Sequence, residues 1–102
     1  MFFLRRLFGI TKTDFRKLLE NGACIVDVRT QREFNSGNIK DSINIPLDQI
    51  KSDIKKIEEL DKVIIFCCLS GARSGFAASI TKAKGIESYN GGGWRSLNKK
   101  LN

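Results

Sequence analysis

The chain has 102 residues, 41% of them hydrophobic and 28% charged, which is the composition of one ordinary globular domain and excludes a disordered chain. Its net charge of +7 comes from the two ends: residues 1–17 and residues 82–102 each carry five basic residues and one acidic residue. This charge favours small anionic ligands or acidic protein surfaces, and nucleic acid is not expected as a partner because no base-reading motif accompanies it.

The first residues are apolar and basic, and Arg5 and Arg6 interrupt the apolar residues early. A secretory signal needs an apolar run of about 7–15 residues, and a membrane-spanning helix needs about 20. We therefore expect neither a secretory signal nor a membrane-spanning helix, and we expect the protein to be cytoplasmic. Residues 1–9 are predicted to be a separate basic and apolar segment that packs on the domain or is partly disordered. A weak membrane-surface or partner anchor is the alternative. Residues 10–102 are predicted to form the domain.

The rest of the sequence predicts helices alternating with strands. In chain order we expect a helix capped by Thr11 or Thr13 and ended by Asn21-Gly22, a buried strand over 23–28, a short helix over 31–36, an extended piece over 43–45, an amphipathic helix over 48–59, a buried strand over 63–67, a helix over 73–84 and a last strand over 86–89. The glycines at 91–93 are expected to break the chain before a short helix near Trp94. Buried strands between helices predict an α/β domain with a central, mainly parallel sheet flanked by helices.

The most informative segment, residues 68–74, connects the strand over 63–67 to the next helix and has the sequence Cys-Leu-Ser-Gly-Ala-Arg-Ser. In a parallel sheet, sites form at the carboxyl ends of strands. The N–H groups of the loop and of the helix start can converge there as a cradle for an anion, and they would favour Cys68 as a thiolate, the nucleophilic form. The residues expected to bind the substrate are Leu69, Ser70, Gly71, Ala72 and Arg73. Arg73 would supply a planar donor fork suited to oxyanions.

The three cysteines, at positions 24, 67 and 68, are odd in number and make a poor disulfide framework. Because the chain has no histidine and no Cys-x-x-Cys pair, we expect no metal and no cofactor. Neighbouring strand residues point to opposite sides, so Cys67 is predicted to pack between sheet and helix while Cys68, as the first loop residue, faces the cradle. A vicinal disulfide with a redox function is the alternative. For an isolated cysteine, an inert buried role would be favoured, and this is the expectation for Cys24.

Several segments of the sequence together resemble a known family. Residues 68–74 are similar to the active-site loop of rhodanese-like domains, which often has the pattern Cys-x-x-Gly-x-Arg-Ser. The segments that are similar to the family's other signatures are residues 25–30, 33–34, 37–39, 43–47 and the glycine turn with tryptophan at 90–94. The resemblance covers about residues 10–98. Asn38 departs from it, because the family commonly has histidine there.

The resemblance implies a single-domain thiosulfate sulfurtransferase. Cys68 would take a sulfane sulfur from an anionic donor such as thiosulfate, hold it as a persulfide and pass it to a thiol, a protein acceptor or cyanide. Cysteine-dependent phosphatases and arsenate reductases share the design but place five residues between cysteine and arginine, and this chain has four. A non-catalytic binding module with the same fold is the other alternative. Asp27, Arg29 and Glu33 are expected to form an ion-pair cluster that ties the first strand's end to the next helix.

Overall fold

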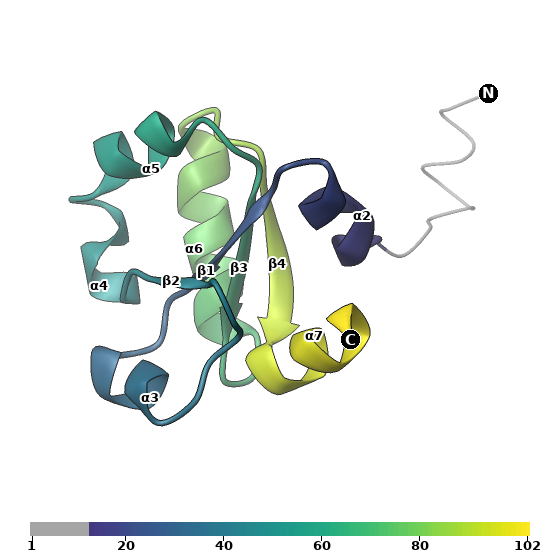
Figure 1. Ribbon diagram of the computed structural model, residues 1–102. Coiled ribbons are helices and arrows are strands. Elements are labelled where there is room, and N and C mark those ends of the chain that lie inside the picture. Colours follow the sequence, from purple (N-terminus) through teal and green to yellow (C-terminus); the bar gives the residue numbers. More distant parts are fainter. Residues whose placement is uncertain (1–12) are drawn as a thin grey trace.

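A sheet of four parallel strands, in the order β2-β1-β3-β4, forms the centre of the computed structural model, which describes residues 13–102 (Figure 1). The elements in chain order are α2 (Phe15–Glu20), β1 (Cys24–Asp27), α3 (Gln31–Asn35), β2 (Ile43–Asn44), α4 (Leu47–Ile50), α5 (Ile54–Leu60), β3 (Ile64–Cys68), α6 (Ala72–Ala83), β4 (Ser88–Gly93) and α7 (Trp94–Leu101). The predicted α/β class and parallel sheet are therefore confirmed. The predicted segment over residues 1–9 and the possible cap Thr11 lie outside the described residues.

The sheet is covered on both faces. Helices α4, α5 and α6 pack on one face, and α2 and α7 pack on the other (Figure 1). Side chains of β3 alternate between the two layers: Ile64, Phe66 and Cys68 face the α6 side, and Ile65 and Cys67 face the α7 side. All five are buried, which explains why the strand is apolar at every position. The alternation sends the two neighbouring cysteines into different surroundings.

The helix predicted over 48–59 is wrong as a single element, because the chain forms α4 and α5 with a turn between them. In that turn the Ser52 hydroxyl donates to the Gln49 carbonyl oxygen at 3.0 Å. Such local side-chain hydrogen bonds compete with helix continuation. The apolar periodicity still identifies the buried face, since Ile50 of α4 and Ile57 of α5 both enter the core.

The start of α2 also differs from the expectation. Its N-cap is Asp14 rather than Thr13, and the Asp14 carboxylate accepts a hydrogen bond from the Lys17 N–H at 3.1 Å. A carboxylate one residue later serves the same purpose as the predicted hydroxyl, because it satisfies an N–H group at the helix start.

The largest correction concerns the glycines at 91–93, which continue β4 instead of breaking the chain. A bulge places Gly92 opposite Cys67 and Gly93 opposite Cys68. A Cβ atom on Gly93 would lie 2.7 Å from the Leu69 carbonyl oxygen, so only glycine lets the loop after β3 lie against β4. With these pairs, β3 spans Ile64–Cys68, one residue later than the predicted 63–67. Cys68 is therefore the last residue of the strand and not the first residue of the loop.

Candidate functional site

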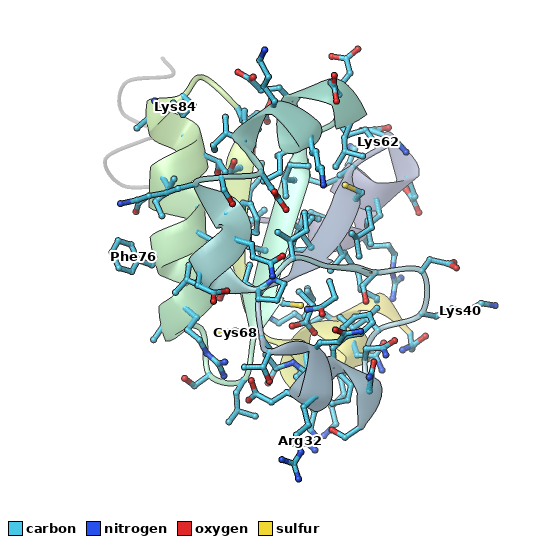
Figure 2. All side chains as sticks on the ribbon, turned by 90° about the vertical axis from the view of Figure 1, so that its left-hand side faces the viewer. Arg32, Lys40, Lys62, Cys68, Phe76 and Lys84 are labelled. Carbon is cyan, nitrogen blue, oxygen red and sulfur yellow. The ribbon has the colours of Figure 1, made fainter. Side chains whose placement is uncertain are left out.

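Cys68 lies at the carboxyl end of β3, beside the loop that leads into α6 (Figure 2). Its side chain is 1% exposed, so the sulfur is held inside the protein rather than presented on the surface. Figure 2 shows it inside the outline of the molecule, while Arg32 of α3 and Phe76 of α6 project into solvent. The end of a parallel strand is the place where this fold class builds its sites.

Several hydrogen-bond donors converge on the Cys68 sulfur. The Gly71 N–H donates to Sγ at 3.0 Å and the Ser74 N–H at 3.4 Å. The Ser74 hydroxyl lies 3.3 Å from Sγ. Gly71 is the N-cap of α6 and has φ of +106°, a left-handed conformation that glycine adopts without strain and that turns the loop back over the sulfur. The predicted cradle of N–H groups is therefore present, and its centre is occupied by Sγ itself.

These donors make Cys68 chemically different from the other two cysteines. Burial alone would raise the pKa of the Cys68 thiol, but hydrogen bonds from Ser74, Gly71 and Ser70 outweigh it and lower that pKa below its ordinary value. Burial and the nearby Asp27 carboxylate raise the pKa of Cys67 to about 12. Burial also raises the pKa of Cys24, against a smaller opposite effect of Lys62. All three cysteines are free thiols, so no vicinal disulfide joins Cys67 to Cys68.

The other predicted loop residues contribute backbone rather than side chains. The side chains of Leu69, Ser70 and Ala72 are exposed, and that of Leu69 is 55% exposed. The Gly71 N–H donates to the Cys68 sulfur, and the N–H group of Ser70 also helps to lower the pKa of Cys68. The identity of the exposed side chains therefore matters little for the sulfur itself, whereas the path of the backbone matters a great deal.

Arg73 differs from the expectation. Its guanidinium forms a two-pronged ion pair with the Glu33 carboxylate of α3, at 2.7 and 3.1 Å, instead of standing free toward the cradle. Both side chains are about one-third exposed. The hydrogen bond from Arg73, followed by one from the Thr30 backbone, lowers the pKa of Glu33 to about 2. Arg73 thus ties α6 to α3 and contributes its positive charge to the site from a distance.

The predicted cluster of Asp27, Arg29 and Glu33 forms, but Glu33 joins it through its backbone carbonyl oxygen and not through its carboxylate. Asp27 and Arg29 form a fully buried ion pair at 2.8 Å. Arg29 also donates to the Gly37 carbonyl oxygen at 2.6 Å and to that of Glu33 at 3.2 Å, while the Glu33 carboxylate pairs with Arg73. The guanidinium of Arg29 lies 4.8 Å from the ring centre of Trp94. The cluster therefore joins the end of β1 to α3 and α7.

Two residues of the site were not predicted: Ser74 and Asn90. Ser74 is fully buried and gives two contacts to Sγ. The available signals were its place at the end of the Cys-x-x-Gly-x-Arg-Ser pattern and in the first turn of the helix after the cysteine loop. Asn90 of β4 accepts from the Ser74 hydroxyl at 2.7 Å and donates to the Gly71 carbonyl oxygen at 3.0 Å. Asn90 lies in the segment 90–94 that resembles the family, but nothing in the sequence assigned it a role, because that role depends on β4 lying beside the loop.

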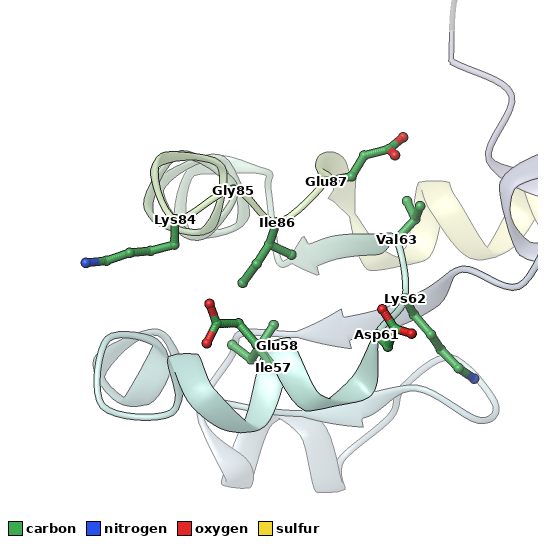
Figure 3. Close-up of a pocket in the computed structure, with 9 residues that line it drawn as sticks. All are labelled: Ile57, Glu58, Asp61, Lys62, Val63, Lys84, Gly85, Ile86 and Glu87. Atoms are coloured by element: carbon green, nitrogen blue, oxygen red, sulfur yellow. The ribbon is translucent and has the colours of Figure 1, made fainter.

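A pocket of about 380 Å³ lies at the opposite end of the strands (Figure 3). Its nine lining residues belong to α5, to the α5–β3 connection and to the α6–β4 connection: Ile57, Glu58, Asp61, Lys62, Val63, Lys84, Gly85, Ile86 and Glu87. It contains no cysteine and none of the residues around Cys68, so its size does not make it the reactive centre. Over residues 13–102 no cluster of potential ligands could hold a metal ion, and no helix is long and apolar enough to cross a membrane.

Comparisons with known proteins identify the family of the chain. The rhodanese-like domain family matches residues 11–100. The chain is 35% identical over 94 residues to the uncharacterized protein YqhL of Bacillus subtilis, covering 90% of this chain and 73% of that protein. It is 36% identical over 69 residues to the thiosulfate sulfurtransferase GlpE of Pseudomonas savastanoi, covering 68% of this chain and 64% of that protein.

Solved structures show the same fold. The human single-domain sulfurtransferase TSTD1 is 25% identical, with a TM-score of 0.68 over 87% of this chain and 93% of that one. Reduced CoADR-RHD of Bacillus anthracis is 36% identical with a TM-score of 0.68, over 86% of this chain but only 16% of that one. Because the family match spans residues 11–100, the chain belongs to the rhodanese-like domain family.

Proposed function

We propose that the protein is a thiosulfate sulfurtransferase in which Cys68 carries the transferred sulfur. The Cys68 thiolate attacks the outer sulfur of a donor such as thiosulfate, forming a new S–S bond. The donor's own S–S bond breaks, and sulfite leaves with its electron pair. An acceptor thiolate, or cyanide in an assay, then attacks the outer sulfur of the Cys68 persulfide and releases the Cys68 thiolate again. Neither step needs a cofactor, because sulfur moves between nucleophiles without an outside oxidant.

The observation that supports this proposal most is the set of donors around Sγ. Gly71 and Ser74 donate from 3.0 to 3.4 Å, and the pKa of Cys68 is lowered, so the thiolate is available at a lower pH than for an ordinary cysteine. The same donors can stabilise the negative charge of a persulfide. A nucleophile that is already ionised needs no general base, and the chain has no histidine to supply one.

The surroundings of Cys68 disfavour phosphoryl chemistry. Four residues separate Cys68 from Arg73, and the sulfur fills the centre of the small loop. A phosphoryl group would need a guanidinium directed at its oxygens. The guanidinium of Arg73 is bound on both prongs by Glu33 instead.

Intact-mass analysis after incubation with thiosulfate tests the proposal. We expect a gain of one sulfur atom, its loss on addition of cyanide or a small thiol, and no gain in Cys68→Ala. Cys67→Ala is the matched control, because it removes the neighbouring thiol and should keep the gain. Hydrolysis of an aryl phosphate, measured in parallel, should be negligible.

Absence of the added sulfur with thiosulfate, a polysulfide and an organic thiosulfonate would overturn the proposal and favour the non-catalytic binding module. We also propose that the reaction takes place in the cytoplasm with a small thiol or a protein thiol as acceptor. The three free thiols support this, because reducing compartments keep cysteines unpaired.

A further inference from the structure

The amide of Asn90 has only one possible orientation. Its Oδ1 accepts from the Gly92 N–H at 2.9 Å, and its Nδ2 donates to the Gly71 carbonyl oxygen at 3.0 Å. A backbone N–H can only donate and a carbonyl oxygen can only accept, so these two partners fix which end of the amide is oxygen. The atom of Asn90 that faces Ser74 is therefore an acceptor.

This orientation decides where the hydrogen of the Ser74 hydroxyl lies. Oγ of Ser74 is 2.7 Å from Oδ1 of Asn90 and 3.3 Å from Sγ of Cys68. Since Oδ1 cannot donate, the shorter contact requires the Ser74 hydroxyl to give its single hydrogen to Asn90. The lone pairs of Oγ then face the sulfur, and the thiol of Cys68 can donate its own hydrogen to Ser74.

Ionisation of Cys68 changes this arrangement. The thiol proton leaves to solvent, and Sγ becomes a charged acceptor with no hydrogen to give. A hydrogen bond to a charged acceptor is stronger than one to a neutral amide, so the Ser74 hydroxyl turns about its Cβ–Oγ bond toward the sulfur. Oδ1 of Asn90 keeps the Gly92 N–H as its partner, and Asn90 is exposed to water, so the released acceptor is not left unsatisfied.

We propose that Asn90 is a positioning residue that holds the Ser74 hydroxyl hydrogen away from Cys68 in the thiol state and releases it to the sulfur when the thiolate or persulfide forms. The proposal rests on the proposed function for its purpose, because such control matters only if Cys68 reacts. Asn90 touches neither the sulfur nor a substrate, and it acts entirely through Ser74.

The charged groups near the sulfur do not explain such an effect. They are Arg73 of α6 with its partner Glu33 of α3, and the buried pair of Asp27 and Arg29 at the end of β1. Each is already paired with an opposite charge, and β4 contributes no charged side chain at this end of the sheet. Replacing Asn90 by another neutral residue leaves all four charges in place.

The test measures the pKa of Cys68 from the ultraviolet absorbance of its thiolate, with Cys68→Ala as the spectral blank. Asn90→Leu has nearly the shape of asparagine but no acceptor, so Ser74 can direct its hydrogen to the sulfur permanently. We expect the pKa of Cys68 to fall by about half a unit to one unit, the size of one net hydrogen bond. Asn90→Ala should lower it in the same direction, in case the leucine is poorly tolerated.

Two further variants test whether Asn90 acts on Cys68 through the Ser74 hydroxyl. In a Ser74→Ala background, Asn90→Leu should no longer change the pKa, because the hydroxyl it controls is gone. Ser88→Ala is the structural control: Ser88 lies on the same strand and bonds Thr81 of α6 at 2.6 Å, so its loss loosens β4 from α6 without touching the site. It should leave the pKa of Cys68 unchanged.

An unchanged or raised pKa in both Asn90 variants would overturn the proposal, because the amide would then act by holding Gly71 or not at all. A change that persists without the Ser74 hydroxyl would overturn it too. The titration uses no sulfur donor, so its result is independent of whether a persulfide forms. A pKa that falls as expected in a protein that never gains sulfur supports the role of Asn90 and contradicts the proposed function alone.

Discussion

Cys67 and Cys68 are consecutive in the chain and almost equally buried, yet the pKa values of their thiols are shifted in opposite directions. Cys67 packs against apolar side chains on the α7 side of the sheet and has its pKa raised to about 12. Cys68 faces the N-terminus of α6 and has its pKa lowered by several donors. Burial by itself therefore does not make a cysteine inert. What decides is whether buried hydrogen-bond donors are directed at the sulfur.

The two alanine variants test the comparison most directly. Cys68→Ala should abolish persulfide formation and leave the fold intact, whereas Cys67→Ala should lose about 1 kcal/mol of stability and keep most of the activity. In the unmodified protein the rate of persulfide formation should rise with pH through a pKa below the ordinary cysteine value, because only the thiolate attacks. Mass analysis measures persulfide formation and its dependence on pH, and chemical denaturation measures the stability of the variants. A folded but inactive Cys67→Ala would show that the assignment of Cys68 as the nucleophile is wrong or that the two cysteines work as a redox pair.

A second prediction concerns a substitution that displaces the hydrogen-bond donors around Cys68 and leaves the cysteine itself in place. The backbone of Gly93, with φ of −68° and ψ of 135°, suits any residue, but a Cβ there would lie 2.7 Å from the Leu69 carbonyl oxygen. Gly93→Ala should therefore displace the loop at a cost of about 1–3 kcal/mol. The rate of persulfide formation should fall by about ten-fold to a hundred-fold, because misplaced donors no longer converge on Cys68. Denaturation and single-turnover mass measurements test this.

The control for Gly93→Ala is Gly85→Ala at the far end of α6. Gly85 has φ of +83°, and a Cβ atom there would meet no other atom within 4 Å, so alanine adds backbone strain without a clash. It should cost stability and leave the rate unchanged. Equal losses of rate in both variants would mean that general loosening, rather than the position of the donors, controls Cys68.

The smallest effect concerns Arg73 and Glu33. Because the pKa of Glu33 is lowered to about 2, the ion pair stabilises the fold above the ordinary glutamate value near 4.5 and is lost as the pH falls toward 2. In Arg73→Met, the pKa of Glu33 should return toward 4.5, and that of Cys68 should rise slightly as a positive charge is removed. Glu33→Gln should lower the pKa of Cys68 slightly, because Arg73 loses its counter-charge.

Carboxyl NMR titration and thiolate absorbance measure these two variants. We expect persulfide formation to change at most a few-fold in either one. Complete loss of sulfur uptake in folded Arg73→Met would contradict the structural role of the ion pair. It would instead support the direct contact with an anionic donor that the loop sequence predicts.

The sequence predicted what depends on local pattern. Apolar runs identified β1 and β3 as strands buried on both faces, and the order of elements indicated a parallel sheet. The segment from Cys68 to Ser74 marked the reactive loop, because a cysteine, a glycine and a helix start follow one another within a few residues. Alternation along β3 also separated Cys67 from Cys68. None of these inferences needs knowledge of which distant segments meet.

Tertiary structure alone decided the rest. Glycine usually interrupts a strand, yet Gly91, Gly92 and Gly93 extend β4. A Cβ atom on Gly91 would lie 2.9 Å from the side chains of Ile65 and Leu97, and one on Gly93 would lie 2.7 Å from the Leu69 carbonyl oxygen. Gly92 meets no such neighbour but has φ of +85°. The sequence predicts an Arg73 that can bind an oxyanion, but in the fold its guanidinium is paired with Glu33, which lies 40 positions away in the chain. Asn90 became a partner of Ser74 only because β4 pairs with β3 beside the start of α6. Local sequence determines which groups can react, whereas the distances between remote segments determine which of those groups are already engaged.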